Sequence, residues 1–136
     1  MVDSAHYIET VRKYFAFLLT EFNISEINQT INGNAFYDVQ YGDKTKNISI
    51  SYENIEDHFQ VIVFKLKDGN LPDYDDKSQT LHLDILNQRI LPKASQDDFK
   101  SNNSFFSAHS PNTELERRLL KAAKDLRLCL KLIPEL

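Results

Sequence analysis

Hydrophobic residues near the amino end of the chain recur every three or four positions and form one stripe. The members of this stripe are Ile8, Val11, Phe15, Leu18, Leu19 and Phe22. This spacing is typical of an amphipathic helix that buries one face. Asp3 or Ser4 is placed to cap the helix by accepting a free backbone N–H. The pattern therefore predicts a helix over residues 4–22.

The middle of the chain alternates between apolar and polar positions, which predicts strands that bury one face. The alternation covers residues 35–41, 47–52 and 58–66, with Tyr37, Val39, Tyr41, Ile48, Ile50 and Tyr52 among its apolar positions. The third run is apolar on both faces, which is usual for a strand that is central or covered twice. A shorter run, residues 26–32, carries Ile27 and Ile31 four positions apart, which places them on one face of a fourth strand. Short turns join the runs, so we expect an antiparallel meander of three or four strands.

Three segments follow these strands, and one of them is compatible with two structures. Residues 67–80 are polar and predict a loop. Residues 81–91 fit a strand through the alternation that begins at Leu81, and they fit a helix through the spacing of Leu83, Leu86 and Ile90. The alternation stops at Leu86, which favours a short helix. Residues 92–112 are rich in Ser, Asn and Asp, which predicts an irregular loop attached to the core by Phe105 or Phe106.

The carboxyl end of the chain has a second helical stripe with a clear start signal. Thr113 and Glu116 have the spacing of a capping box, in which each side chain accepts the backbone N–H of the other residue. The apolar stripe comprises Leu115, Leu119, Ala122, Ala123, Leu126, Cys129, Leu130 and Ile133. We therefore expect a layered α+β domain. Its N-terminal helix and long C-terminal helix pack against the sheet, either side by side or on opposite faces.

Composition supports this picture and limits the function. With 136 residues, of which 41% are hydrophobic, the chain suits a single domain, 1–136, with one core. No apolar run approaches the roughly 18 residues of a membrane helix, and the charges of the first helix argue against a signal peptide. The only cysteine, Cys129, permits no intrachain disulfide and fits a cytoplasmic protein. A net charge of −4 disfavours direct nucleic-acid binding, which requires a basic face.

Acidic residues gather around the last predicted strand. Residues 53–76 contain seven acids and two lysines. The stretch KDGNLPDYDD, residues 67–76, does not match a calcium loop, because its glycine precedes Asp73 and Asp75 and no distal Glu follows. A solvated turn is one interpretation, since Asp, Asn, Gly and Pro are turn residues. A partner surface is the other, since clustered acids orient a basic partner and Tyr74 adds an aromatic residue of the kind enriched in interfaces.

The chain contains no motif for catalysis, metal binding or cofactor binding. The histidines fall on four separate segments and form no zinc-binding pattern, and they are His6, His58, His82 and His109. Cys129 lies on the apolar stripe of a predicted helix, where a buried structural residue is expected. No serine has the G-x-S-x-G context of a hydrolase nucleophile. We therefore predict that the chain is not an enzyme, has no catalytic residue, and binds no metal or cofactor.

The order of elements resembles that of the small cytoplasmic immunity proteins of bacterial polymorphic-toxin and contact-dependent growth-inhibition systems. The stretches that carry the resemblance are YFAFLLTEFNI, AFYDVQYG, NISISYE, HFQVIVFKL and LPDYDD. The resemblance implies a non-enzymatic inhibitor, or antitoxin, that binds its cognate toxin domain and blocks the active site or the substrate surface. Such a toxin is often a nuclease, and a nuclease has a basic face because it binds phosphates.

An acidic surface on the inhibitor is therefore the expected contact with the toxin. The candidate partner-binding residues are Glu53, Glu56, Asp57, Asp73, Tyr74, Asp75 and Asp76. The strand over residues 58–66 separates the first three from the last four by roughly 30 Å, so we expect two acidic edges. The alternative function is a small-ligand-binding or adaptor domain with a pocket between the sheet and the helices, lined by Tyr37, Tyr41 and Tyr52.

Overall fold

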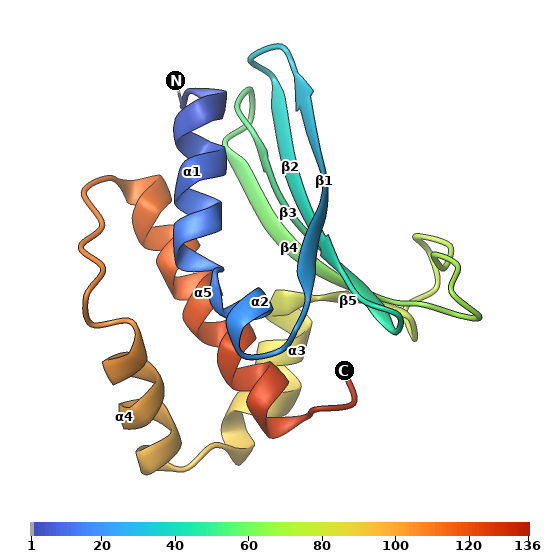
Figure 1. The fold of residues 1–136 in the computed structure, drawn as a ribbon, viewed down its shortest axis with the longest axis vertical. Coiled ribbons are helices and arrows are strands. Elements are labelled where there is room, and N and C mark those ends of the chain that lie inside the picture. Colours follow the sequence, from blue (N-terminus) through green and yellow to red (C-terminus); the bar gives the residue numbers. More distant parts are fainter. Residues whose placement is uncertain (1) are drawn as a thin grey trace.

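Five antiparallel strands form one sheet in the computed structural model of the protein, which describes residues 2–136 (Figure 1). The strands are β1 (Ser25–Asn32), β2 (Phe36–Gly42), β3 (Lys46–Glu53), β4 (His58–Lys65) and β5 (Thr80–His82). Each strand pairs with its neighbours in the sequence, in the order β1-β2-β3-β4-β5. The predicted meander is therefore confirmed, with five strands instead of three or four. The additional strand is the three-residue β5. It overlaps the start of residues 81–91, the segment whose sequence fits either a strand or a helix.

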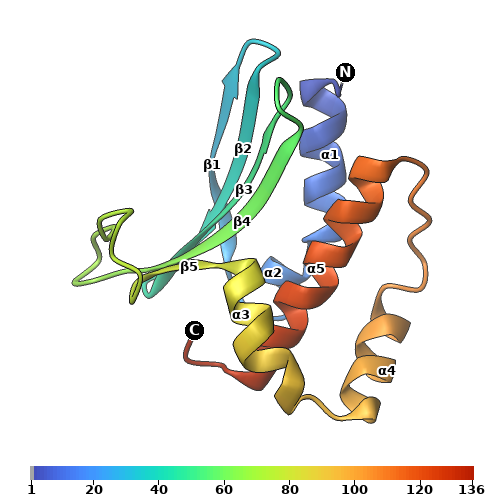
Figure 2. The same cartoon turned by 180° about the vertical axis from the view of Figure 1, so that it is seen from behind.

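The helices gather on one side of this sheet, and Figure 2 shows the same arrangement from behind. They are α1 (Ser4–Tyr14), α2 (Phe17–Thr20), α3 (Leu83–Ile90), α4 (Gln96–Phe105) and the long α5 (Glu114–Leu132), with a short 3₁₀ turn, η1 (Leu91–Lys93). Helices α1 and α5 contact each other on the same face, so the two predicted helices lie side by side. The fold is thus an α+β layer of helices on one face of an antiparallel sheet. Within residues 2–136, no helix is both long and apolar enough to cross a bilayer.

The core lies between the sheet and the helices. The inward positions predicted from alternation are all buried there, namely Tyr37, Val39, Tyr41, Ile48, Ile50 and Tyr52. Tyr7 of α1 packs its ring against Tyr37 and Tyr52, with ring centroids 5.6 and 6.0 Å away. Its hydroxyl donates a hydrogen bond to the carbonyl of Ile50, so the polar end of this buried ring is satisfied.

The first helix is shorter than predicted, because the segment from residue 4 to 22 is broken after α1. Asp3 caps α1 by accepting the backbone N–H of His6, as expected. Phe15 then leaves helical geometry, and the chain turns into the four-residue α2. The break buries Phe17, which lies off the predicted stripe and packs edge-on against Phe106 near α4. The break therefore adds one buried aromatic ring to the core, which favours the folded state.

Strand β1 forms an exposed edge of the sheet, and the prediction that its two isoleucines share one face is wrong. The register shifts between Glu26 and Asn28, so Ile27 occupies a β-bulge. Ile31 pairs with the inward-facing Tyr37, whereas the Ile27 side chain lies over Gly42 on the opposite face. A bulge adds one residue to a strand and reverses the alternation beyond it, which a spacing rule based on a regular strand cannot anticipate.

Residues 81–91 satisfy both interpretations of the sequence, because Leu81 belongs to β5 and Leu83 begins α3. The prediction of an irregular loop over residues 92–112 is wrong for its first half, which forms α4. A capping box starts this helix, with Ser95 accepting the N–H of Asp98 and Asp98 accepting that of Ser95. Within α4 only Asn102 is buried, so the helix has no apolar stripe that would identify it.

Two predictions about residues 92–116 are confirmed in part, namely the attachment of residues 92–112 to the core by a phenylalanine and the capping box at the start of the last helix. Phe106 enters the core and Phe105 stays exposed. Thr113 caps α5 by accepting the N–H of Glu116. The Glu116 carboxylate accepts the N–H of Asn112 instead of that of Thr113, so the capping box is not reciprocal.

Candidate functional site

The face of the sheet opposite the helices is open and polar. Along β2 and β3, the residues between the inward positions include Asp38, Gln40, Ser49 and Ser51. The Asp38 carboxylate accepts hydrogen bonds from the Ser49 hydroxyl and the Gln40 amide, each at 2.7 Å. No helix covers this face in either view of residues 2–136 (Figures 1 and 2). The open face therefore carries no helix, but Asp38 and Ser51 at its centre are buried among neighbouring side chains, at 7% and 4% exposure.

One end of the open face carries the acidic loop, which we define as residues 67–79. The loop stands away from the sheet on the side opposite the helices (Figure 1). Tyr74 is 59% exposed, and its ring packs edge-on against His82 of β5 at 5.8 Å between centroids. On the same face, Ile62 of β4 pairs with His82 and is buried outside the main core. Strand β4 is thus apolar on both faces because it faces the helices on one side and lies beside this aromatic contact on the other.

The acids of this loop differ in how they are bonded. Asp76 accepts the backbone N–H and the hydroxyl of Ser78, which lowers the pKa of its carboxyl group. The side chains of Asp73 and Asp75 are exposed and make no hydrogen bond or ion pair with the described residues. Asp73 uses only its backbone carbonyl, which accepts the Thr80 hydroxyl at 3.0 Å. Asp68 is likewise exposed and uses only its backbone carbonyl, so within the described residues the loop presents three unpaired carboxylates to solvent, two of them beside the anchored tyrosine.

The opposite end of the open face carries the acidic turn, which we define as residues 53–57. The Glu53 carboxylate accepts the backbone N–H groups of Ile55 and Glu56, at 2.7 and 2.9 Å. Asp57 accepts the Tyr52 hydroxyl and forms an ion pair of 2.7 Å with Arg118 of α5. These contacts hold the pKa of Asp57 below its usual range. Only Glu56 keeps a carboxylate without a partner among the described residues of this turn.

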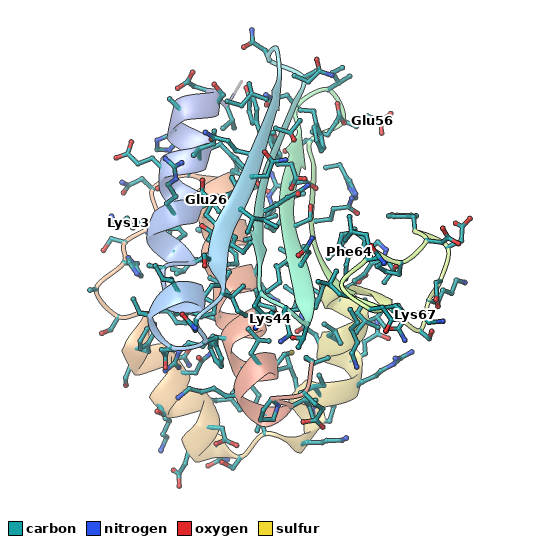
Figure 3. The ribbon with its side chains drawn as sticks, turned by 45° about the vertical axis from the view of Figure 1, so that its right-hand side comes forward. Lys13, Glu26, Lys44, Glu56, Phe64 and Lys67 are labelled. Carbon is teal, nitrogen blue, oxygen red and sulfur yellow. The ribbon has the colours of Figure 1, made fainter. Side chains whose placement is uncertain are left out.

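The structure does not bring the seven predicted contact residues together. Glu53, Glu56 and Asp57 lie in the acidic turn, and Asp73, Tyr74, Asp75 and Asp76 lie in the acidic loop. Figure 3 shows the separation, with Glu56 near one end of the sheet and Lys67 near the other. The eight residues of β4 between them span roughly 26 Å at the usual rise of a strand. The two acidic segments therefore lie beyond opposite ends of β4, and the acidic turn is also joined to the helical side through the ion pair of Asp57 with Arg118.

Grooves on the helical side offer an alternative site. One groove, of about 380 Å³, lies between β4, α3 and α5 and is lined by Phe59, Asn87 and Lys121 among others. A second, of about 480 Å³, lies where α1 and α5 begin, and Tyr52 contributes to it. Tyr37 and Tyr41 were expected to line a pocket, but they are packed into the core and line neither groove. The tyrosine-lined pocket predicted for the alternative function is therefore wrong for two of its three residues.

Groups that could support chemistry are spread over several places, although the first groove is lined by two histidines and two aspartates, His58, His82, Asp84 and Asp125. Between residues 2 and 136, no three His, Cys, Asp or Glu side chains gather in a way that could hold a metal ion. Burial raises the pKa of the Cys129 thiol to about 12, so this cysteine is a poor nucleophile. His6 contacts Glu116, whereas His109 packs against Tyr14, where burial and Lys13 lower the pKa of its ring. These histidines have different neighbours and share no site.

Sequence reasoning missed two exposed apolar residues beside the acids. Ile55 lies at the tip of the acidic turn and is 79% exposed, and Leu71 lies in the acidic loop and is 61% exposed. The available signal was an aliphatic residue inside each of the turn sequences ENIED and GNLPD. Both ends of the open face therefore combine an exposed aliphatic side chain with acid that has no partner within the described residues, Glu56 alone in the turn and Asp68, Asp73 and Asp75 in the loop.

Comparison of the chain with protein-family models, with curated proteins and with solved structures found no match. The open face and its two acidic ends are therefore the features from which a function can be inferred.

Proposed function

We propose that this chain is a non-enzymatic inhibitor that binds a basic protein, a bacterial toxin domain of the kind that immunity proteins neutralise. The observation that carries the proposal is the acidic loop, where Asp73 and Asp75 have no partner within the described chain and flank the anchored Tyr74. Unpaired acids attract a basic surface over a distance of about a Debye length, near 10 Å, before contact. An aromatic side chain between them supplies apolar contact area once the surfaces meet.

The size of the open face suits such a partner. A stable protein interface buries about 800 Å² on each side, which corresponds to a patch roughly 30 Å across. The acidic loop and the acidic turn border the open face at a separation of the same order, because β4 spans roughly 26 Å between them. A partner seated on this face would contact both acidic ends. An inhibitor that occupies a phosphate-binding surface in this way blocks the substrate without any chemical step.

Charge reversal in the acidic loop tests the proposal. The proposal places the cognate toxin in the gene immediately upstream of this chain, so the probe is the purified carboxy-terminal domain of the protein which that gene encodes. Surface plasmon resonance measures its association rate. We expect the double variant Asp73→Lys/Asp75→Lys to associate about tenfold more slowly at low salt, since exposed charges at an interface act mainly on the association rate. The difference should shrink as salt screens the charges.

The matched control is Glu9→Lys/Asp97→Lys, which changes the net charge by the same amount. Both control residues are exposed on helices, Glu9 in α1 and Asp97 in α4. We expect the control to associate within about twofold of the wild type, because its charges lie away from the open face. Equal slowing by the two double variants, or no binding of the domain by the wild type, would contradict the proposal.

A further inference from the structure

Ile55 is an unusually exposed apolar residue for its position. At 79% exposure it is more exposed than Leu71, Tyr74 or any other large hydrophobic residue of the described chain. It sits at the tip of the acidic turn, between Glu53 and Asp57, where the chain reverses from β3 to β4. An isolated exposed aliphatic residue needs no explanation by itself. The surroundings of Ile55 are what distinguish it.

The first half of the acidic turn is held by an extensive hydrogen-bond network. Asn54 donates from its side chain to the carbonyl of Asn34 at 2.6 Å and to the hydroxyl of Tyr37 at 3.0 Å. Its backbone N–H donates to the carbonyl of Ala35, and its side-chain oxygen accepts the N–H of Val2. The Glu53 carboxylate accepts the backbone N–H groups of Ile55 and Glu56. The turn is therefore tied to the β1–β2 connection and to the amino end of the chain.

The second half of the turn is fastened to helix α5. Asp57 adopts a left-handed backbone conformation, with φ of 55°, which a residue other than glycine takes at some cost. Its carboxylate accepts from Tyr52 and from the guanidinium of Arg118, whose Nη1 also donates to the Asp57 carbonyl at 3.4 Å. These bonds hold the strained residue in place. The two halves together fix the backbone on both sides of Ile55.

We infer that the acidic turn is a preformed apolar anchor, in which Ile55 enters an aliphatic pocket on the partner protein while Glu56 pairs with a basic group at the rim of that pocket. This inference rests on the proposed function and assigns the anchor to the end of the open face opposite the acidic loop. A rigid turn loses little conformational entropy on binding, so a buried aliphatic side chain contributes nearly its full transfer free energy. In measured interfaces a few residues that fill well-packed, desolvated pockets carry most of the binding free energy, and the contacts around them mainly exclude water.

The acids of the turn have two different roles. The Glu53 carboxylate accepts backbone N–H groups of the turn, and the Asp57 carboxylate pairs with Arg118. Both are therefore positioning residues instead of partner contacts. Glu56 is the acid that remains available beside Ile55. The predicted contact set at this end of the face therefore becomes Ile55 and Glu56.

Graded truncation of Ile55 tests the inference, with the same upstream-encoded domain as the probe and isothermal titration calorimetry as the measurement. We expect Ile55→Ser to weaken Kd by at least about thirtyfold, the effect of losing a hot-spot residue. Ile55→Val removes one methylene group and should weaken Kd by about fourfold. The control Leu19→Ser alters a residue of α2 that is 54% exposed on the helical side, and it should leave Kd within about twofold.

The outcomes separate this inference from the proposed function. If the wild type binds the domain and Ile55→Ser binds it within threefold of the wild type, the anchor is wrong and the proposed function stands. If the wild type does not bind the domain, the proposed function fails and the anchor fails with it. Thermal unfolding of Ile55→Ser checks that the variant is folded, and the exposure of Ile55 leads us to expect an unchanged midpoint.

Discussion

Two exposed aspartates, Asp57 and Asp73, show how the surroundings of a residue set its role. Asp57 bonds to Tyr52 and Arg118 and connects a turn to a helix. The Asp73 side chain makes no hydrogen bond or ion pair with the described residues. An acid that already has a cation gains little from a basic partner, whereas an acid without one can form a new ion pair. The two residues have the same side chain. Their contacts alone make Asp57 a structural residue and Asp73 a candidate partner contact.

The role of Asp57 predicts a specific pH dependence of stability. The Tyr52 hydroxyl and Arg118 favour the ionised carboxylate, so the pKa of Asp57 in the folded state lies below the ordinary value of 3.8. The carboxylate therefore stabilises the fold above about pH 4, and this contribution is lost as the pH falls through the folded-state pKa. We expect Asp57→Asn to have a lower Tm than the wild type at pH 7, and the difference to shrink below about pH 4.

Differential scanning calorimetry from pH 2.5 to pH 7 measures this difference. Asn tolerates the left-handed conformation, so the substitution tests the charge without altering the backbone preference. Asp73→Asn serves as the control, because Asp73 has no ionic partner in the described chain and its replacement should leave Tm nearly unchanged at every pH. A Tm difference for Asp57→Asn that stays constant down to pH 2.5 would argue against an ionic role.

At the scale of elements, Arg127 of α5 joins three helices through one buried guanidinium. It donates to both carboxylate oxygens of Glu21, which follows α2, at 2.6 and 3.0 Å. It also donates to Asn102 of α4 at 2.8 Å and lies 3.8 Å from the ring centre of Phe105. Asn102 in turn donates to the Lys124 carbonyl. These polar contacts, together with the burial of Phe106, hold α4 against α5 in the absence of an apolar stripe.

Removal of Arg127 should therefore destabilise the protein strongly. We expect Arg127→Ala to lower the free energy of unfolding by about 3 kcal/mol, because it leaves Glu21 and Asn102 without their shared partner. Arg127→Lys should recover less than half of this loss, since an ammonium group cannot bind the carboxylate with two parallel donors. Urea denaturation followed by far-UV circular dichroism measures both values.

The control for this prediction is Lys121→Ala in the same helix. Lys121 pairs with Asp125 at 2.8 Å, but its side chain is largely exposed. We expect a loss of less than about 0.5 kcal/mol, as is usual for an exposed ion pair. Similar losses for Arg127→Ala and Lys121→Ala would show that the Arg127 network contributes no more than a surface pair.

At the scale of the whole molecule, one core connects the sheet to the helices. Its members come from α1, α2, strands β2 to β5, α3 and α5, and Phe106 after α4 joins them. The main core lies on the helical face of the sheet. The opposite face carries no helix, although Asp38, Ser51 and Ile62 are buried on it, so a partner could occupy that face without exposing the main core. The layered arrangement thus separates the surface that stabilises the protein from the surface that we propose to bind.

A single core predicts that residues 1–136 unfold as one cooperative domain. We expect coincident urea transitions from far-UV circular dichroism, which follows the helices, and tyrosine fluorescence, which follows the buried tyrosines. Tyr7, Tyr37 and Tyr52 report on the interface between α1 and the sheet, where their rings pack together. A separate early transition in the helical signal would show instead that α4 unfolds independently.

Regular periodicity predicted most of the fold, and its failures have specific causes. The alternation in β2 and β3 and the stripe of α5 were sufficient to predict these elements and their buried sides, because each element buries one continuous face. The bulge at Ile27 reverses the faces of β1, and the break after α1 buries Phe17. Helix α4 was missed because it is held by polar contacts to Arg127, which come from a distant segment of the chain.

The candidate site was likewise predicted from the sequence only in part. Composition was enough to identify the acid-rich turn and loop and to separate them by the length of a strand, since these are properties of neighbouring residues. Whether an acid is free depends on partners that are far away in the sequence, such as Arg118, which lies 61 positions from Asp57. The exposure of Ile55 likewise follows from a turn fixed by Val2, Asn34 and Tyr37. Local patterns therefore specify the elements and their charges, whereas long-range contacts decide which side chains remain available to a partner.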